Sequence, residues 1–563
     1  MAVCGGWRDL RDDQWPGSRR RAGSPDMIGT HGHPMSAMSS EGPFMQSSFA
    51  PLSGLLVSAL LLSACQTAPR MAGAPPAAPA PIAASPAALA VLPERLANAQ
   101  ENGWQRVAEQ PISTFSMSSD TASYNLTKRM IREGHKPPPE AVRPEEFVNA
   151  FDYAYPAPSD PSQPFTPSIA VYPSPWNEGR QILRIGLRTY APPRQARPAL
   201  NLVFLVDVSG SMAGPDRLDL IKRGLRLLLP RLRAEDRISL VTYANGTQTV
   251  LDSVPGDRLA KIEAAIDGLS AAGGTAGGAG LNMAYDLAAK NRKPGAVNRV
   301  VLATDGDFNI GPSSVAELTE LIAARRRSGI YLTTIGVGLG NINDRLLNTL
   351  ARTGNGIALY AGDLEDLSRG LVEDFTTNTV PVADDVKLQV EFNPVQVTEY
   401  RLVGYETRPL RQEDFGNDRV DAGEVGSGKA VTALYEFVQV GSAAHAIPVR
   451  RYAAQVPSPA SGDLSREFAH LRIAYKLPGQ ERSRLIERSI MPEDAHRRFE
   501  EAPEDARFAT AVAGFAQVLR RSGQVDADLP RIARMAEQAR GPDPDGRRAE
   551  LISLIWLSAG GRR

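Results

Sequence analysis

Three oxygen-bearing side chains follow one short apolar run near the middle of the chain. Residues 202–206 read Leu-Val-Phe-Leu-Val, and Asp207, Ser209 and Ser211 come directly after them at alternate positions. A short apolar run bounded by turn residues is typical of a strand buried on both faces of a parallel sheet. Open sheets of that kind bind ligands at the carboxyl ends of their strands. Carboxylate and hydroxyl oxygens gathered at such an edge favour binding of a hard divalent cation.

Two later stretches supply further oxygens. The glycine-rich stretch 273–280 contains Thr275, and a second apolar run, 300–303, leads to Asp305. The sequence therefore predicts an oxygen-only metal site built from three loops, with the ligands Asp207, Ser209, Ser211, Thr275 and Asp305. Such a set suits Mg²⁺ or Mn²⁺ better than Zn²⁺ or Cu²⁺. Because only the two aspartates carry charge, the cation keeps its attraction for an incoming carboxylate, and at least one coordination position stays open or hydrated.

This combination resembles the von Willebrand factor type A (VWA) domain, whose metal-ion-dependent adhesion site (MIDAS) consists of D-x-S-x-S, then a Thr, then an Asp. The resemblance implies that the glutamate or aspartate of a protein partner completes the coordination sphere. It thus implies magnesium-dependent protein binding. Each part alone also has a structural explanation, since an Asp after a strand often caps the next helix and Ser-Gly-Ser forms ordinary turns.

Two other functions remain open on the residues alone. An open metal position could activate water in a magnesium-dependent hydrolase, but that chemistry needs a general base. No histidine falls within 199–379, and Asp307 is the one obvious additional acid beside the site. Alternatively, the metal could have only a structural role and hold the loops together in an envelope scaffold. The stretch 273–280 lacks the lysine of a phosphate-binding loop. We therefore expect a binding protein and not an enzyme.

The elements that must position these residues alternate between strands and helices. Residues 238–243 and 330–337 are apolar and strand-like, and helical spacing of leucines and isoleucines separates them. The expected fold class is α/β, with a doubly wound, mostly parallel sheet in a central domain, 199–379. An N-terminal α+β segment, 101–198, and a C-terminal β-rich and helical domain, 380–563, flank it.

The flanking segments carry weaker signals. The phrase Ser-Ser-Asp-Thr-Ala-Ser-Tyr, 118–124, resembles a motif found in one group of bacterial envelope VWA proteins, although Ser118 stands where that group has an aspartate. We expect it to cap or pack a helix. The acidic stretch 414–424 has the composition of a calcium loop, but its spacing does not match the EF-hand pattern, so a surface turn is the alternative.

The beginning of the chain predicts a lipid anchor. Residues 52–64 are mostly apolar, too few to span a bilayer comfortably, and end in Leu-Ser-Ala before Cys65. This ending resembles the lipobox of bacterial lipoproteins, which implies that 1–65 is an extension with a signal peptide, that Cys65 carries the lipid, and, since Gln66 follows, that the protein faces the periplasm from the outer membrane. No Lys or Arg lies between Ala22 and Cys65, and a start at Met45 would explain the unusually long leader.

The remaining composition supports this placement and excludes other classes. Residues 66–100 are rich in alanine and proline and predict an extended linker. Lys plus Arg equals Asp plus Glu at 63 each, so no net field favours nucleic acid. Only two cysteines are present, Cys4 and Cys65, which excludes a disulfide framework.

Overall fold

The computed structural model describes residues 95–96, 100–191, 197–275, 277–306, 308, 314–372, 381–420, 422–448, 450 and 463–560. All of them belong to one compact unit, Ala87–Arg563. The helices are α1 (Ala122–Arg132), α2 (Pro144–Val148), α3 (Leu218–Leu228), α4 (Leu259–Asp267), α5 (Gly277–Lys290), α6 (Val315–Arg327), α7 (Asp344–Thr353), α8 (Leu364–Leu367), α9 (Glu504–Arg520), α10 (Leu529–Gln538) and α11 (Arg547–Ser558). The strands are β1 (Gln105–Arg106), β2 (Ile112–Ser116), β3 (Phe165–Pro173), β4 (Gln181–Thr189), β5 (Leu200–Asp207), β6 (Arg237–Tyr243), β7 (Thr247–Pro255), β8 (Val297–Thr304), β9 (Ile330–Val337), β10 (Ala358–Ala361), β11 (Pro381–Phe392), β12 (Val397–Val403), β13 (Gly423–Gly426), β14 (Ala430–Gln439), β15 (Ala469–Lys476) and β16 (Arg484–Ile490).

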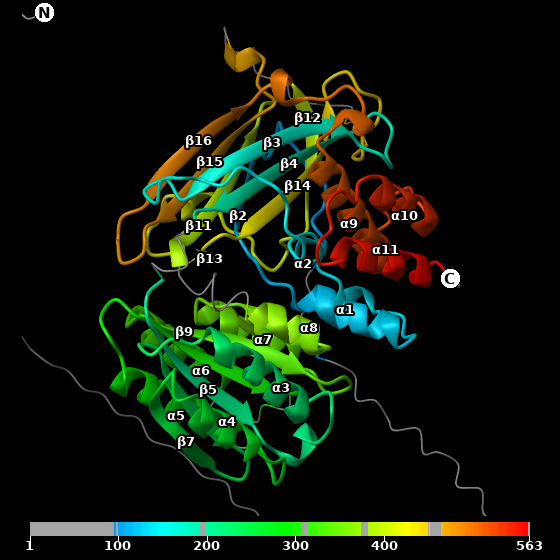
Figure 1. The fold of residues 1–563 in the computed structure, drawn as a ribbon. Coiled ribbons are helices and arrows are strands. Elements are labelled where there is room, and N and C mark those ends of the chain that lie inside the picture. Colours follow the sequence, from blue (N-terminus) through cyan, green and yellow to red (C-terminus); the bar gives the residue numbers. More distant parts are fainter. Residues whose placement is uncertain are drawn as a thin grey trace, which may run out of the picture. The chain divides into compact units, whose positions relative to one another are not determined.

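The central domain is a six-stranded sheet in the order β10-β9-β8-β5-β6-β7. Every neighbouring pair is parallel except β6 with β7. Alternate residues of β5 serve the two faces, since Leu202 packs with α3, α4 and α8 whereas Val203 packs with α5, α6 and α7. Helices therefore cover both faces of the sheet (Figure 1). The predicted doubly wound, mostly parallel fold is confirmed.

The two edge strands, β7 and β10, are the elements of this sheet that the sequence pattern does not reveal. In β7 only Leu251 and Val254 are buried, so this edge strand lacks the continuous apolar run of the central strands. β10 has only four residues, too few for a periodic pattern to be recognised. Edge strands depend on pairing with a distant neighbour, and hydrophobic periodicity does not record such pairing.

The two segments that flank the central domain share their sheets. One sheet has the order β1-β12-β14-β4-β3, and in the other β2 and β15 both pair with β11. The sequence prediction treats 101–198 and 380–563 as separate domains, whereas the structure pairs strands from both, for example β4 with β14. Local periodicity cannot indicate antiparallel partners that lie more than two hundred residues apart, such as Ile185 and Ala433.

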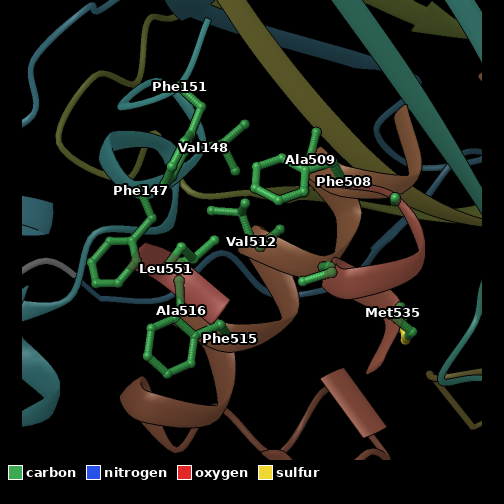
Figure 2. Close-up of a cluster of buried hydrophobic side chains, with 14 of the residues drawn as sticks. Phe147, Val148, Phe151, Phe508, Ala509, Val512, Phe515, Ala516, Met535 and Leu551 are labelled. Carbon is green, nitrogen blue, oxygen red and sulfur yellow. The ribbon is translucent and has the colours of Figure 1, made fainter. Parts of the chain in front are cut away.

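The C-terminal helices pack on this shared body through a cluster of aromatic and aliphatic side chains (Figure 2). The helical spacing of Phe508, Val512, Phe515 and Leu519 predicts one apolar stripe. The first three of these side chains are buried in this cluster, against Phe147 and Phe151 from the N-terminal segment. The same cluster covers one face of β14, while the opposite face of the strand packs in the other core. The alternation of apolar residues over 431–437 predicts a half-buried strand, and this prediction is wrong because helices cover the face expected to meet solvent.

The segments 101–198 and 381–560 together form what we call the flanking body, and helix α1 joins this body to the central domain. The Asn125 amide donates to the Tyr360 carbonyl, at 2.9 Å, on the edge strand β10. Asp120 accepts a hydrogen bond from the backbone N–H of Ala358 at 3.1 Å and pairs with Arg408 on the flanking body. Thr121 at the helix start makes no side-chain cap. The segment 118–124 thus has a packing role, in that it docks α1 onto the central sheet.

Candidate metal centre

The register of the central strands brings the predicted ligands to one edge of the sheet. Asp207 lies opposite Tyr243 on β6, and Val206 lies opposite Ala303 on β8. Since all three strands are parallel, their carboxyl ends meet at the same place. Asp305 directly follows β8, so its backbone lies beside that of Asp207.

Hydrogen bonds hold the Asp207 carboxylate in one orientation. The side chain is fully buried. Its Oδ1 accepts from the backbone N–H of Ser209 at 2.9 Å, and its Oδ2 accepts from the hydroxyls of Tyr243 and Thr304, both at 3.0 Å. Sequence analysis missed these two hydroxyl donors. They are the final residues of β6 and β8, so alignment of the predicted strand ends would have placed them next to Asp207.

The two serines lie in a tight turn directly after β5. Their hydroxyl oxygens, Ser209 Oγ and Ser211 Oγ, are 3.1 Å apart. The backbone N–H of Gly210 between them donates to the carbonyl of Gly273 at 2.9 Å. A Cβ at Gly210 would lie 3.3 Å from that carbonyl oxygen, so glycine permits the close approach of the two loops.

Thr275 lies two residues beyond Gly273, in the loop that contacts the serine turn. The loop is tied down at two more points, by the Ala272 N–H donating to the Val208 carbonyl at 2.8 Å and by the Gly274 N–H donating to the Asn245 side chain at 2.5 Å. The Thr275 side chain is partly exposed. The structure therefore brings the loop of Thr275 against the turn of Asp207, although the two are separated widely in sequence.

Asp207 and Asp305 form a buried pair of like charges. Asp305 is 2% exposed. Burial raises the pKa of the Asp207 carboxyl, its hydrogen bonds with Ser209 and Thr304 oppose that shift, and the charge of Asp305 adds to it. Gly306 then turns the chain away with a φ of +100°, and a Cβ there would lie 2.4 Å from the Asn343 nitrogen. A divalent cation would relieve the repulsion between these two carboxylates.

The donor set fits a hard cation and excludes a soft one. In the described part of the chain, no three side chains of His, Cys, Asp or Glu gather as a metal-binding group. This centre has two such side chains, and hydroxyls must supply its other protein ligands. Mg²⁺ and Mn²⁺ accept that chemistry, whereas Zn²⁺ and Cu²⁺ favour nitrogen and sulfur.

Several other predicted features lie elsewhere. Cys65 and Asp307 are outside the described residues. In the acidic stretch 414–424, Lys387 occupies the centre of the turn, and its Nζ donates to the carbonyls of Asp414 and Asn417 at 2.9 and 2.6 Å. An ammonium group thus binds the backbone oxygens of this loop that a calcium ion would need.

Comparisons with known proteins divide the chain into three matched regions. The family model described as von Willebrand factor type A domain matches residues 201–374, that described as von Willebrand factor matches 92–184, and that described as Uncharacterized protein YfbK, C-terminal, matches 377–559. The Uncharacterized protein YfbK of Escherichia coli (strain K12) is 41% identical over 467 residues, which cover 82% of this chain and 80% of that protein.

Two more distant similarities concern parts of the chain or its fold. The inter-alpha-trypsin inhibitor heavy chain H2 of Sus scrofa is 24% identical over 218 residues, covering 37% of this chain and 23% of the heavy chain. Among solved structures, the von Willebrand factor type A protein from Catenulispora acidiphila is 16% identical, with a TM-score of 0.39, and the match covers 73% of this chain and 99% of that one.

Proposed function

Since the chain belongs to the family of bacterial von Willebrand factor type A proteins that includes Escherichia coli YfbK, we propose that its central domain binds a protein partner through a divalent cation. The observation that carries the proposal is the buried aspartate pair, Asp207 and Asp305, at the edge where the serine turn meets the Thr275 loop. The cation would be Mg²⁺ or Mn²⁺.

The residues of this chain have separate tasks in that function. Asp207, Ser209, Ser211, Thr275 and Asp305 would hold the ion. When bound, the ion supplies a positively charged position to which an acidic side chain of the partner coordinates. Tyr243 and Thr304 fix the orientation of Asp207 through their hydrogen bonds. The Gly210–Gly273 contact holds two of the ligand loops together before the partner arrives, which lowers the entropic cost of binding.

Hydrolysis is the less favoured function because a general base is missing from the described site. Tyr243 is fully buried and its pKa is raised well above the usual value, by burial first and by the charge of Asp207 next, so its hydroxyl remains a hydrogen-bond donor. No histidine lies within 199–379. The site therefore favours binding over catalysis.

Cation-dependent capture of a partner tests this proposal. The full-length protein is crosslinked to its neighbours in envelope membranes with Mg²⁺ or with EDTA, and the same is done for Asp207→Asn. We expect a partner that is captured only with Mg²⁺ and only by the wild type. Asp252→Asn, which changes an exposed carboxylate of the same domain, should capture as the wild type does. Equal capture in EDTA would contradict metal-dependent binding and favour a purely structural role for the metal. Mg²⁺-dependent cleavage of phosphate esters would instead favour the hydrolase.

We further propose that Cys65 carries a lipid that tethers the protein to the envelope through the predicted linker 66–100, whose last part, at Arg95, already bonds to Ile342 of the central domain. No helix in the described residues is both long and apolar enough to cross a membrane. The proposal rests on the lipobox-like ending at Cys65. Cys65→Ser is expected to move the protein from the membrane pellet to the supernatant after cell lysis. Cys4→Ser serves as the control, and continued sedimentation of the Cys65 variant would contradict a lipid anchor.

A further inference from the structure

Two arginines link the serine turn of the metal centre to helix α1, which belongs to the flanking body. Arg217 lies immediately before α3, and its Nη1 donates to the carbonyl of Ser211 at 3.0 Å. Its Nη2 reaches the carbonyl of Leu339 at 3.4 Å, in the loop after β9. The backbone oxygen of the predicted ligand Ser211 is thus held by a side chain that is not itself among the predicted ligands.

The contact between Arg217 and the loop after β9 is close. A Cβ at Gly338 would lie 2.6 Å from the Arg217 Nε, and the φ of Gly338 is +76°, so glycine is required here on both counts. The carbonyl of Gly338 accepts a hydrogen bond from the Tyr360 hydroxyl at 2.9 Å. The loop 338–339 therefore has Arg217 on one side and Tyr360 on the other.

Arg129 of α1 completes the connection. Its Nη1 donates to the Tyr360 hydroxyl at 3.1 Å, and its Nη2 donates to Asp216 at 2.7 Å, in the residue just before Arg217. The Arg129 side chain is 13% exposed, so solvent weakens these interactions only partly. The same helix is anchored on β10 by Asn125. One guanidinium of α1 thus contacts Asp216, which precedes Arg217, and Tyr360, whose hydroxyl bonds the loop that Arg217 also reaches.

We propose that Arg217 and Arg129 are positioning residues of the metal centre, so that cation binding to the central domain is coupled to the docking of α1 from the flanking body. The inference rests on the proposed function. Mg²⁺ requires near-ideal octahedral placement of its oxygens. Groups that orient the ligands change metal affinity about 10- to 100-fold when removed. The serine turn is held in place partly by α1, so the affinity of the site for Mg²⁺ should fall when the docking of α1 is weakened.

Titration of Mg²⁺ into the full-length protein by calorimetry tests the positioning role. Arg217→Ala is expected to weaken Mg²⁺ binding about 10- to 100-fold. Arg129→Ala, which removes the contacts with both Asp216 and Tyr360, should weaken it by a smaller factor, and Asp216→Ala, which removes only one of them, by less again. The double variant Arg129→Ala/Asp216→Ala should bind as Arg129→Ala does, because without Arg129 the Asp216 side chain has no bond to α1 left to lose. Arg226→Ala breaks an exposed ion pair with Asp267 on the same domain and should leave the affinity unchanged.

The coupling also has a readout at α1 itself. By linkage, an ion whose affinity depends on α1 docking must stabilise that docking. Mg²⁺ is therefore expected to slow hydrogen exchange of the backbone amides of α1, none of which lies on a ligand loop, and Arg129→Ala should abolish this slowing. The proposed coupling would be overturned, with the metal site left intact, if Arg217→Ala binds Mg²⁺ with unchanged affinity. The same holds if Mg²⁺ does not change the rate of hydrogen exchange in α1. A wild-type protein that binds no Mg²⁺ would overturn the proposed function and the coupling together.

Discussion

The Asp207→Asn variant is expected to lose measurable Mg²⁺ binding while it keeps its fold. Asparagine keeps one acceptor oxygen for the hydroxyls of Tyr243 and Thr304, but its amide nitrogen cannot accept from the backbone N–H of Ser209, and the charge that attracts the ion is gone. It also removes the repulsion with Asp305, which acts when the cation is absent. In EDTA the lost hydrogen bond and the lost repulsion oppose each other, so the variant should stay folded and unfold at a temperature close to that of the wild type. Adding Mg²⁺ should raise the unfolding temperature of the wild type alone, since a ligand stabilises only the state that binds it.

Asparagine is a better probe of this position than alanine. Asp207→Ala would leave the buried hydroxyls of Tyr243 and Thr304 without their acceptor, which costs about 1–3 kcal/mol each. A loss of folding would then hide a loss of metal binding. Asp252→Asn is the matched control, as an exposed carboxylate change in the same domain. A Mg²⁺-dependent rise in unfolding temperature that survives Asp207→Asn would contradict the assignment of Asp207 as a ligand.

The Lys128→Met variant is expected to destabilise the protein by about 3–5 kcal/mol, the usual cost of removing one partner of a buried ion pair. Lys128 Nζ lies 2.5 Å from Asp366 Oδ1, and the two side chains are 1% and 0% exposed. Burial raises the pKa of Asp366 although the charge of Lys128 opposes the shift, so this carboxylate depends on the lysine. The pair joins α1 to α8 of the central domain.

Two further variants make the Lys128 result specific. In Lys128→Met/Asp366→Leu both charges are removed, and most of the lost stability should return, because no buried charge is left unpaired. Lys290→Met breaks the exposed pair with Asp252 and should change stability by less than about 1 kcal/mol. The stability of all three variants is measured by chemical denaturation, with proteolytic cleavage near α1 as the readout of unfolding. A Lys128→Met protein as stable as Lys290→Met would contradict an energetic role for this junction.

The local pattern of apolar residues was sufficient to predict most of the strands and helices of the central domain. The apolar run of β5 and the identical bounds of predicted and observed β9, Ile330–Val337, show that buried parallel strands leave a clear signal. The loops of Asp207 and Asp305 were placed together because parallel strands end at one edge, whereas the Thr275 loop, which follows α4, joined the set through the resemblance to the VWA domain. The donors Tyr243 and Thr304 were missed because the predicted ligands were sought only in the loops, whereas these two residues are the last of their strands.

What the sequence could not indicate depends on contacts between distant segments. The pairing of β4 with β14 and the docking of α1 on β10 both join parts of the chain that no periodic pattern relates. Arg217 illustrates the same limit within the site. In the sequence it is one arginine before a helix, and only the positions of Gly338 and Arg129 around it show that it supports the serine turn.

A crystal of the full-length protein soaked in Mn²⁺ tests the central claim most directly, through the anomalous scattering of the ion. The account predicts one strong anomalous peak bounded by Asp207, Ser209, Ser211, Thr275 and Asp305, with a coordination position left to water or to an acidic side chain of a neighbouring molecule. A Mn²⁺ peak elsewhere and none at this edge, at concentrations that saturate binding in solution, would contradict it.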